Sequence, residues 1–328
     1  MSTFLLVGTG EVAIRAARQL VDTPGCDHLL IASREPERAR DLAASLHAGA
    51  TGLDHGDVRL PDGLDAVVVG THGARAREWT RAAVEVGVAV ATTRDAGLTE
   101  IDPAARANDV AVVTGASMCP GLSDVLAAHA AALFSRVDEV HVARAGAAGP
   151  ACVDEVRVAR KEVPGEWRGG EWRADRIFGP ELVWFPEPVG QRECHLVTAG
   201  VAATVATVPT ARLVTVRLCG APSTSWLSTR VRRNPVDAGW GAVRIEVRGL
   251  VDDGIRSVVY GAVDRTAVVA GAVLATTALG LAGVLGAVVT PESGVRALGE
   301  VVVPVPFLQE LATRGVRAAA FEGVMPAA

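Results

Sequence analysis

Residues 4–13 read Phe-Leu-Leu-Val-Gly-Thr-Gly-Glu-Val-Ala, and they decide the fold of the chain. Four apolar residues typical of a buried parallel strand lead into the pattern Gly8-x-Gly10-x-x-Ala13, and a segment of helical periodicity follows. A strand, a tight turn and a helix in this order are typical of a dinucleotide-binding loop. Gly8 allows the turn, Gly10 lets the backbone approach a pyrophosphate, and Ala13 lets the helix pack on the strand. The alternative is a glycine-rich turn without a ligand. The residues expected to contact the nucleotide here are Gly8, Thr9, Gly10, Glu11, Val12 and Ala13.

The first 117 residues alternate short apolar strands with amphipathic helices. Short loops join these segments, and the alternation predicts an α/β fold with a doubly wound parallel sheet of the Rossmann type. Residues 54–62 are polar and loop-like, so the third strand is poorly marked. After the first strand, strands are expected at 28–32, 66–69, 88–91 and 110–114, and helices at 37–46, 76–86 and 103–108.

From about residue 137 the pattern changes to strands with few helices. The run Val243-Arg-Ile-Glu-Val-Arg248 alternates apolar and polar residues, which is typical of a sheet with one solvated face. Asp253-Gly254 indicates a hairpin turn, and the Pro-, Gly- and Trp-rich residues 164–190 indicate a long loop over the sheet. We therefore expect a second, α+β domain with a mixed or antiparallel sheet. Its strands are expected at 140–144, 153–163, 182–185, 213–218, 243–248 and 256–259.

These patterns divide the chain into a nucleotide-binding domain of residues 1–118, a substrate and dimerisation domain of residues 119–290, and a C-terminal segment of residues 291–328. Helical periodicity over 307–321 predicts that this last segment returns to the first domain. Residues 266–290 carry no charge and are long enough to cross a bilayer. Because most of them are small, a buried helix in a core or a subunit interface is favoured over a membrane span.

The composition excludes several classes of partner. The chain has 328 residues and a net charge of −5, so no basic field favours nucleic acid or an anionic membrane. The five cysteines are odd in number and include no CxxC pair. They predict a reduced, cytoplasmic protein without a disulfide framework or a zinc site. The first residues have no basic segment, and their apolar run is too short for a signal peptide.

The end of the second strand indicates which nicotinamide cofactor binds. An NAD-specific domain carries an acidic residue there, about 20 residues past the glycines, that binds the ribose 2′-hydroxyl. This strand ends in Ser33 and Arg34 instead, and a hydroxyl with a guanidinium favours a 2′-phosphate. Arg38, one helical turn further, adds positive charge, whereas the adjacent Glu35 is the main objection. The sequence therefore favours NADP(H) over NAD(H).

Ligands of open α/β sheets bind beyond the carboxyl ends of the strands. The loops that follow the later strands are therefore expected along one rim, with the nicotinamide near the last two loops, 92–95 and 117–124. The further residues expected to bind cofactor on this rim are Thr71, His72, Gly73, Thr93, Ser117 and Met118.

Three residues of this rim are candidates for proton transfer. His72 follows a strand and can titrate near neutrality; the alternative is a loop histidine that touches only ribose or solvent. Cys119 precedes a proline at a helix start, where a thiol can have a lowered pKa; the alternative is a buried, inert cysteine. Asp124 either contacts nicotinamide or substrate, or only caps the helix together with Ser123.

The second domain offers further candidates on the segment expected as a strand over 153–163. Lys161 is the only lysine of the chain and a candidate acid or base, with a solvated sheet face as the alternative. Arg144 and Arg157 are candidate clamps for a substrate carboxylate, and Trp172 is a candidate pocket wall or a simple anchor of its loop. His195 lies beside an acid and a cysteine, but no second ligand has suitable spacing, so no metal site is predicted.

The glycine loop over 8–10, the strand end over 32–34 and the segment Gly115-Ala-Ser-Met-Cys-Pro-Gly-Leu-Ser-Asp124 together resemble the saccharopine dehydrogenase-like oxidoreductases. The turn at Asp253-Gly254 that leads to residues 264–267 is also similar. The resemblance covers most of residues 1–135 and loosely the remainder. It implies a nicotinamide-dependent enzyme with a Rossmann domain, a mixed-sheet substrate domain and a homodimeric state.

The combined expectation is an NADPH-dependent oxidoreductase that transfers hydride to or from a small metabolite. Relatives in the resembled family act at carbon–nitrogen bonds of amino acids and polyamines, and an imine or amino-acid C–N bond is the expected substrate. One alternative is reduction of a conjugated C=C bond in an enoyl substrate. Another is a nucleotide-sensing protein without turnover, because fold alone does not prove chemistry and no Tyr-x-x-x-Lys motif is present.

Overall fold

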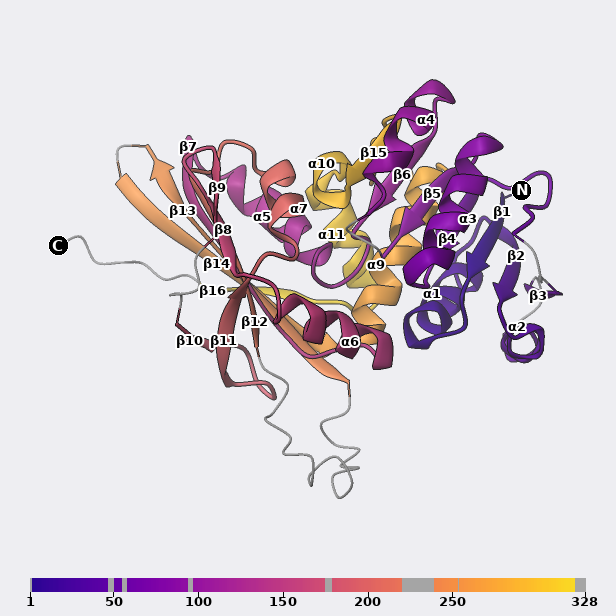
Figure 1. The fold of residues 1–328 in the computed structure, drawn as a ribbon, viewed down its shortest axis with the longest axis horizontal. Helices are drawn as coiled ribbons and strands as arrows, with labels where there is room; N and C mark the ends of the chain where they lie inside the picture. Colours follow the sequence, from indigo (N-terminus) through magenta and orange to yellow (C-terminus); the bar gives the residue numbers. More distant parts are fainter. Residues whose placement is uncertain are drawn as a thin grey trace, which may run out of the picture. The chain divides into compact units, whose positions relative to one another are not determined.

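A computed structural model describes residues 2–46, 50–54, 58–93, 97–174, 179–219, 239–252 and 254–321. The chain forms two compact units, which can be followed along the ribbon (Figure 1). Unit 1 comprises Met1–Val125 and Ala267–Val316, and unit 2 comprises Leu126–Thr266 and Arg317–Ala328.

Unit 1 contains a seven-stranded sheet in the order β15-β6-β5-β4-β1-β2-β3, with all neighbours parallel. The reversal of strand order beside β1 is the topology of a doubly wound Rossmann sheet, so the predicted fold class is confirmed. The third strand, poorly marked in the sequence, is present. The strands are β1 (Ser2–Val7), β2 (Cys26–Ser33), β3 (Ala50–Asp54), β4 (Ala66–Val69), β5 (Ala89–Thr92), β6 (Ala111–Thr114) and β15 (Gly294–Ala297).

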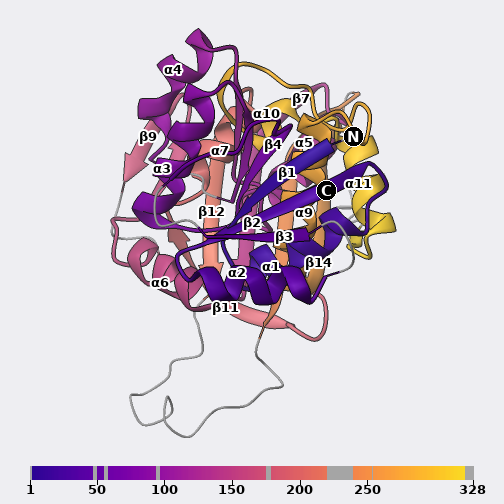
Figure 2. The same ribbon diagram turned by 90° about the vertical axis from the view of Figure 1, so that its right-hand side faces the viewer.

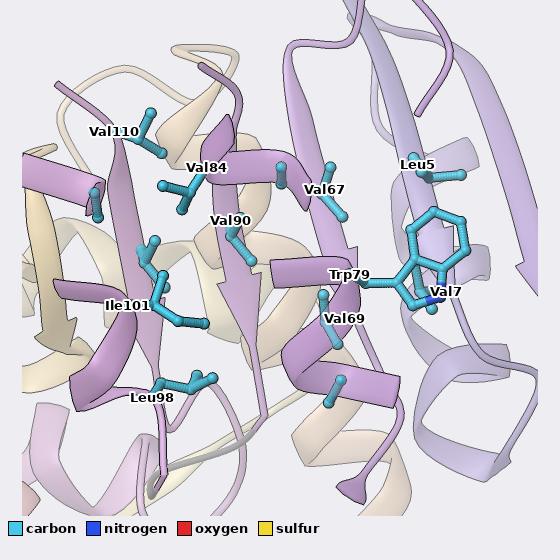
Figure 3. Packing of buried hydrophobic residues seen from close by; sticks show 14 of the residues in the cluster. Leu5, Val7, Val67, Val69, Trp79, Val84, Val90, Leu98, Ile101 and Val110 are labelled. Carbon is cyan, nitrogen blue, oxygen red and sulfur yellow. The ribbon is translucent and has the colours of Figure 1, made fainter. Parts of the chain in front are cut away.

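Helices cover both faces of this sheet (Figure 2). Every residue of Ala66–Val69 is buried, as expected for a parallel strand enclosed from both sides. Trp79 of α3 packs in one cluster with Leu5 and Val7 of β1 (Figure 3). The helices of this part of the chain are α1 (Glu11–Val21), α2 (Pro36–Ala44), α3 (Gly73–Glu85), the 3₁₀ turn η1 (Thr99–Ile101), α4 (Asp102–Ala107) and α5 (Leu122–Ala131), the last of which begins in unit 1 and ends in unit 2.

The uncharged stretch forms α9 (Thr266–Leu281), a buried helix that packs on α1. Gly271 allows the close approach, because an added Cβ there would lie 2.8 Å from the backbone nitrogen of Ala16. None of the helices in the described ranges is long and apolar enough to cross a membrane. Unit 1 also contains α10 (Leu298–Val301) and α11 (Pro304–Thr313).

Unit 2 contains a mixed sheet, as predicted, and its strands lie in the order β10-β11-β12-β7-β13-β14-β16. Only β12 and β7 are parallel; the other neighbours along this order are antiparallel. The strands are β7 (Arg136–Ala145), β10 (Glu181–Trp184), β11 (Gln191–Val197), β12 (Leu213–Cys219), β13 (Trp240–Val251), β14 (Gly254–Arg265) and β16 (Ala318–Phe321), with β8 (Gly165–Arg168) paired to β12 and β9 (Glu171–Ala174) paired to β8. The helix α7 (Val201–Thr207) also belongs to this unit.

The strand expected over 153–163 is wrong, because Pro150–Ala159 forms the helix α6. Pro150 occupies the first turn, where its fixed φ favours a helix, and Arg157 pairs with Asp154 at 2.9 Å across one helical turn. The valines that suggested a strand are half-buried or exposed, so they do not form a buried face of a sheet. Residues 164–190, expected as a long loop, contain β8 and β9, whereas the strand expected over 182–185 is present as β10. The helix expected over 307–321 ends at Thr313 and is followed by β16.

The prediction that the chain has no disulfide framework is also wrong. Cys194 of β11 and Cys219 of β12 form one, because the antiparallel register places the two residues directly opposite each other. Such a pairing depends on the register of two strands 25 residues apart in sequence, and no local spacing motif reports it. Cys26, Cys119 and Cys152 are not part of this disulfide.

Candidate nucleotide-binding site

The glycine loop joins β1 to α1 in unit 1. Gly8 has φ +120°, a value that side-chain-bearing residues rarely adopt, and its amide donates to the carbonyl of Ala32 at 2.8 Å. An added Cβ at Gly8 would lie 3.0 Å from the carbonyl oxygen of Gly70, which follows β4. Gly70 in turn approaches Ala13 of α1, since its own added Cβ would lie 3.0 Å from the Cβ of Ala13. The three small residues therefore set the close packing of β1, β4 and α1.

Gly10 precedes the first residue of α1 and faces open space. An added Cβ there would meet no atom within 4 Å, and Gly10 has no side chain to cap the helix. The N-terminus of a helix presents unpaired amides and the positive end of its dipole, which together attract a phosphate. The space at Gly10 and this helix end fit the pyrophosphate of a dinucleotide. Glu11 in the first turn is exposed beside the same helix end.

The end of β2 is bonded to the glycine loop. Thr9 Oγ1 and Ser33 Oγ lie 3.1 Å apart, and the amide of Glu35 donates to Ser33 Oγ at 3.3 Å. Arg38 of α2 donates to the carbonyl oxygen of Thr9 at 3.3 Å and pairs with the Glu35 carboxylate at 3.3 Å. Arg34 is exposed. The structure thus brings together the predicted residues Thr9, Ser33 and Arg38, and the pairing of Glu35 with Arg38 is a feature that the sequence did not reveal.

The next two predicted loops leave the sheet at the same rim. The Gly70 amide donates to the carbonyl of Val7, and the Thr93 amide donates to the carbonyl of Val69. The segment after β4 therefore extends the pairing of β4 with β1, and the segment after β5 extends the pairing of β5 with β4. Thr71 is half-buried, and His72 is exposed at the start of α3, directly before Gly73. Residues 94–96, part of the loop expected near the nicotinamide, lie outside the described residues.

The turn between β6 and α5 is tightly folded. Gly121 has φ +127°, and an added Cβ would overlap the carbonyl oxygens of Ser117 and Gly115. Its amide donates to the Asp124 carboxylate at 2.8 Å, and the Ser123 hydroxyl donates to the same carboxylate at 3.3 Å. Asp124 is only 1% exposed, so the structure gives it at least the capping role that was the alternative expectation. Met118 and Cys119 are also buried, and Ser117 is half-buried.

The predicted substrate residues all lie in unit 2. Arg144 is half-buried near the end of β7, and Arg157 is exposed on α6, paired with Asp154. Lys161 is exposed just after α6, two residues past its end, not on a sheet face. Trp172 of β9 is 43% exposed, and its ring covers Gly165 of β8. Within the described ranges, His, Cys, Asp and Glu residues form no group of three that could hold a metal ion.

A family model and solved structures show what this chain is similar to. The model of shikimate / quinate 5-dehydrogenases matches residues 1–116, which hold the glycine loop and most of the rim described above. No curated protein sequence matches the chain.

Among solved structures, apo saccharopine dehydrogenase (L-Glu forming) from Saccharomyces cerevisiae has a TM-score of 0.73 at 14% identity, with 98% of this chain and 100% of that chain covered. The DAP dehydrogenase of C. glutamicum in complex with DAP has a TM-score of 0.53 at 14% identity, covering 95% and 98%. An engineered D-amino acid dehydrogenase has a TM-score of 0.51 at 13% identity, covering 93% and 96%. The expected resemblance to saccharopine dehydrogenase-like proteins is confirmed at the level of the fold.

Proposed function

We propose that the protein is a nicotinamide-dependent oxidoreductase that acts on a C–N bond of an amino acid or a related imine. The observation that carries this proposal is the loop of Gly8, Gly10 and Ala13, with open space at Gly10 in front of the N-terminus of α1. The substrate class is supported by the three structures above, whose names describe dehydrogenases of saccharopine, DAP and D-amino acids and which share the fold over nearly the whole chain.

We propose NADP(H) as the preferred cofactor. Ser33 and Arg38 are bonded to the glycine loop through Thr9, and no acidic residue stands at the tip of β2. The Glu35 carboxylate, the main objection to a 2′-phosphate, is paired with Arg38. The exposed Arg34 supplies a second positive charge next to Ser33. With Glu35 neutralised by Arg38, the Ser33 hydroxyl and the Arg34 guanidinium leave a net positive charge that suits a phosphate monoester better than a ribose hydroxyl pair.

The residues of the chain divide the remaining tasks. The bound nicotinamide supplies or accepts the hydride. His72, exposed at the rim, is proposed to exchange a proton with the substrate nitrogen or with water, because an imidazole can act as both a proton donor and a proton acceptor. The buried Cys119 thiol is a second candidate, and Asp124 is proposed to position the loop that carries it. Arg144, Arg157, Lys161 and Trp172 of unit 2 are proposed to contact the substrate.

The cofactor preference is tested by titrating wild type and Arg34→Ala with NADPH and NADH. We expect Arg34→Ala to weaken NADPH binding about tenfold, the value of one charge-assisted contact to phosphate, and to leave NADH binding unchanged. Arg40→Ala, an exposed arginine two residues beyond Arg38 on α2, is the matched control and should bind both nucleotides like wild type. Equal losses for both nucleotides in Arg34→Ala would refute the 2′-phosphate assignment.

The substrate class is tested by following nicotinamide absorbance with a panel of L- and D-amino acids in the oxidative direction, 2-oxo acids with amines in the reductive direction, and enoyl thioesters. We expect turnover with the first two groups, and His72→Asn should lower kcat with little change in nucleotide affinity. Turnover of enoyl thioesters alone would replace the C–N assignment by C=C reduction.

A further inference from the structure

The disulfide of unit 2 joins two buried residues in the middle of a sheet face. Cys194 is 0% exposed and Cys219 is 6% exposed. Both belong to an apolar cluster with Val183 of β10 and Phe185, the residue directly after β10. Cys219 is the last residue of β12, and 25 residues separate the two cysteines. The bond therefore closes a loop that contains the last part of β11, the whole of α7 and the whole of β12.

The same face carries a charged cavity whose wall is continuous with the disulfide. Glu181 of β10 lies opposite Cys194 in the strand register, so Glu181, Cys194 and Cys219 form one row across three strands. Glu181 pairs with Arg217 of β12 at 2.8 Å, and Arg217 lies two residues before Cys219 on the same face. The cavity has a volume of about 220 Å³. Its lining residues include Glu139, His141, Glu181, Val183, Arg217, Arg244, Glu246 and Arg248.

The hairpin of β10 and β11 has few other attachments to the sheet. β10 is the edge strand, and β11 joins β12 through only four register pairs, from Cys194–Cys219 to Val197–Val216. The disulfide lies at the end of this ladder that is nearer to β10. Without the covalent bond, the position of Glu181 and Val183 in the cavity wall would depend on that short ladder, the Arg217 ion pair and the apolar cluster.

The surroundings of the two sulfurs also accommodate the reduced pair. The carbonyl oxygen of Arg192 lies 3.6 Å from Cys194 Sγ. A disulfide sulfur has no proton to donate to this oxygen, whereas the thiol of a reduced Cys194 can donate to it. Residues directly opposite in an antiparallel pair remain neighbours whether or not their side chains are bonded, so both redox states fit the same strands.

We propose that Cys194 and Cys219 form a reversible redox modification site that holds the β10–β11 hairpin, and with it one wall of the charged cavity, against β12. The reaction partner is a low-molecular-weight thiol or its disulfide. In reduction, a thiolate attacks Sγ of Cys219, the residue that is not completely buried, and Cys194 leaves as a thiolate that takes up a proton. A second thiol then displaces Cys219 from the mixed disulfide. One protein disulfide and two small thiols thereby become two protein thiols and one small disulfide, and oxidation is the reverse.

The proposal is tested on the full-length protein equilibrated in buffers of reduced or oxidised dithiothreitol, alkylated with N-ethylmaleimide and analysed by peptide mass spectrometry. We expect the peptides with Cys194 and Cys219 to take up the label in the reducing buffer and to exclude it in the oxidising buffer. Hydrogen exchange on the same samples should show amides of 181–184 and 191–197 exchanging at least about tenfold faster after reduction, with the amides of β1 and β2 unchanged.

Two variants serve as controls. Cys219→Ala should show the fast hairpin exchange in both buffers, and Cys152→Ser, which changes a free thiol of α6, should behave like wild type. Labelling of both cysteines in the oxidising buffer would overturn the proposal, as would a bond that the native protein keeps in the reducing buffer. Equal hairpin exchange in the two redox states of wild type would overturn the structural part, whether or not Cys219→Ala folds.

Discussion

Gly8 and Gly10 have different physical roles although they belong to one turn. The fold requires a glycine at position 8, because φ is +120° there and an added Cβ would lie 3.0 Å from the carbonyl oxygen of Gly70. Gly10 has φ −81°, an ordinary value, and open space around the missing Cβ. We propose that this open space takes the pyrophosphate of the nucleotide, because no neighbouring atom of the described protein needs a glycine at position 10.

This difference predicts opposite effects of the two alanine substitutions. Gly8→Ala should lower the free energy of unfolding by about 1–3 kcal/mol, the cost of a strained backbone, as measured by thermal or urea unfolding. Gly10→Ala should change the free energy of unfolding by less than about 1 kcal/mol and weaken nucleotide binding at least about tenfold. A stable Gly8→Ala protein would show that the turn relaxes more easily than its geometry indicates.

The turn at Gly8 and the close packing at Ala13 could be predicted from the sequence, because both follow from local backbone geometry. The contacts of Arg38 with Thr9 and Glu35 could not be predicted from the sequence, because they depend on how the end of β2 lies beside the glycine loop. The Cys194–Cys219 pair was missed for the same reason, because only the register of two strands brings the sulfurs together.

At the scale of elements, Asp102 joins α4 to the edge strand β15. Its carboxylate accepts the amide of Val295 and the side chain of Arg106, each at 2.8 Å. These contacts with Arg106, together with the Val295 amide, lower the pKa of Asp102 below its ordinary value. A lowered folded-state pKa means that the carboxylate stabilises the fold above the pKa of the unfolded chain, and that this contribution is lost as the pH falls through the folded-state pKa.

Asp102→Asn should therefore destabilise the protein by about 1 kcal/mol at pH 7, because the amide keeps an acceptor for Val295 but loses the charge. The difference from wild type should shrink as the pH falls below about 4, where the carboxyl of the unfolded chain is protonated, and should vanish below the lower folded-state pKa. Urea unfolding between pH 3 and pH 7 measures it. Asp62→Asn, at an exposed position, is the control, and a difference for Asp102→Asn that stays constant with pH would contradict the charge-based explanation.

Buried helices and strands were predicted more accurately than exposed ones. The strands β4 and β6 are buried at every position, and their apolar runs are unambiguous. The segment of α6 is rich in valine, a residue typical of strands, and has little burial, which favoured a strand. The decisive signals were Pro150 and the Arg157–Asp154 spacing. The strand β15 gave no signal of its own, because it is a four-residue edge strand added from a distant part of the chain.

At the scale of the whole molecule, the chain returns to unit 1 after building most of unit 2. Arg314, at the end of α11, fixes this return: it donates to the carbonyl and side chain of Gln19 and to the hydroxyl of Thr23, and it pairs with Glu310 at 2.8 Å. Its side chain is only 7% exposed. The end of α11 is thereby bonded to α1, the helix that begins at the glycine loop.

Arg314→Ala should lower the free energy of unfolding by about 2–3 kcal/mol, because the partners in α1 lose charge-assisted hydrogen bonds in a buried place. Arg317→Ala, three residues later and exposed, should leave stability within about 0.5 kcal/mol of wild type. Calorimetric unfolding of both variants gives the comparison. Equal stability of the two would mean that α11 is held by its apolar face alone.

The two halves of the fold differed in how far the sequence revealed them. The Rossmann half follows from local periodicity, because each strand and helix is adjacent to the next in the chain and packs with it. In unit 2 the strands β7, β10, β12, β13 and β14 were predicted, whereas β8, β9, β11 and β16 were not. The strand order was not visible, because β7 pairs with β12 and β13 across large separations, as the pairing of Arg144 with Leu218 and Val243 illustrates. Which unit-2 residues meet the substrate stays a prediction.

The central claim is that the loop of Gly8 to Ala13 binds a nicotinamide dinucleotide. Calorimetric titration of wild type and Gly10→Ala with NADPH and NADH tests it most directly, with thermal unfolding of both proteins run alongside. We predict that wild type binds one nucleotide per chain, NADPH more tightly than NADH, and that the folded Gly10→Ala protein binds both at least about tenfold more weakly. Absence of binding by folded wild type, or equal binding by the variant, would contradict the claim.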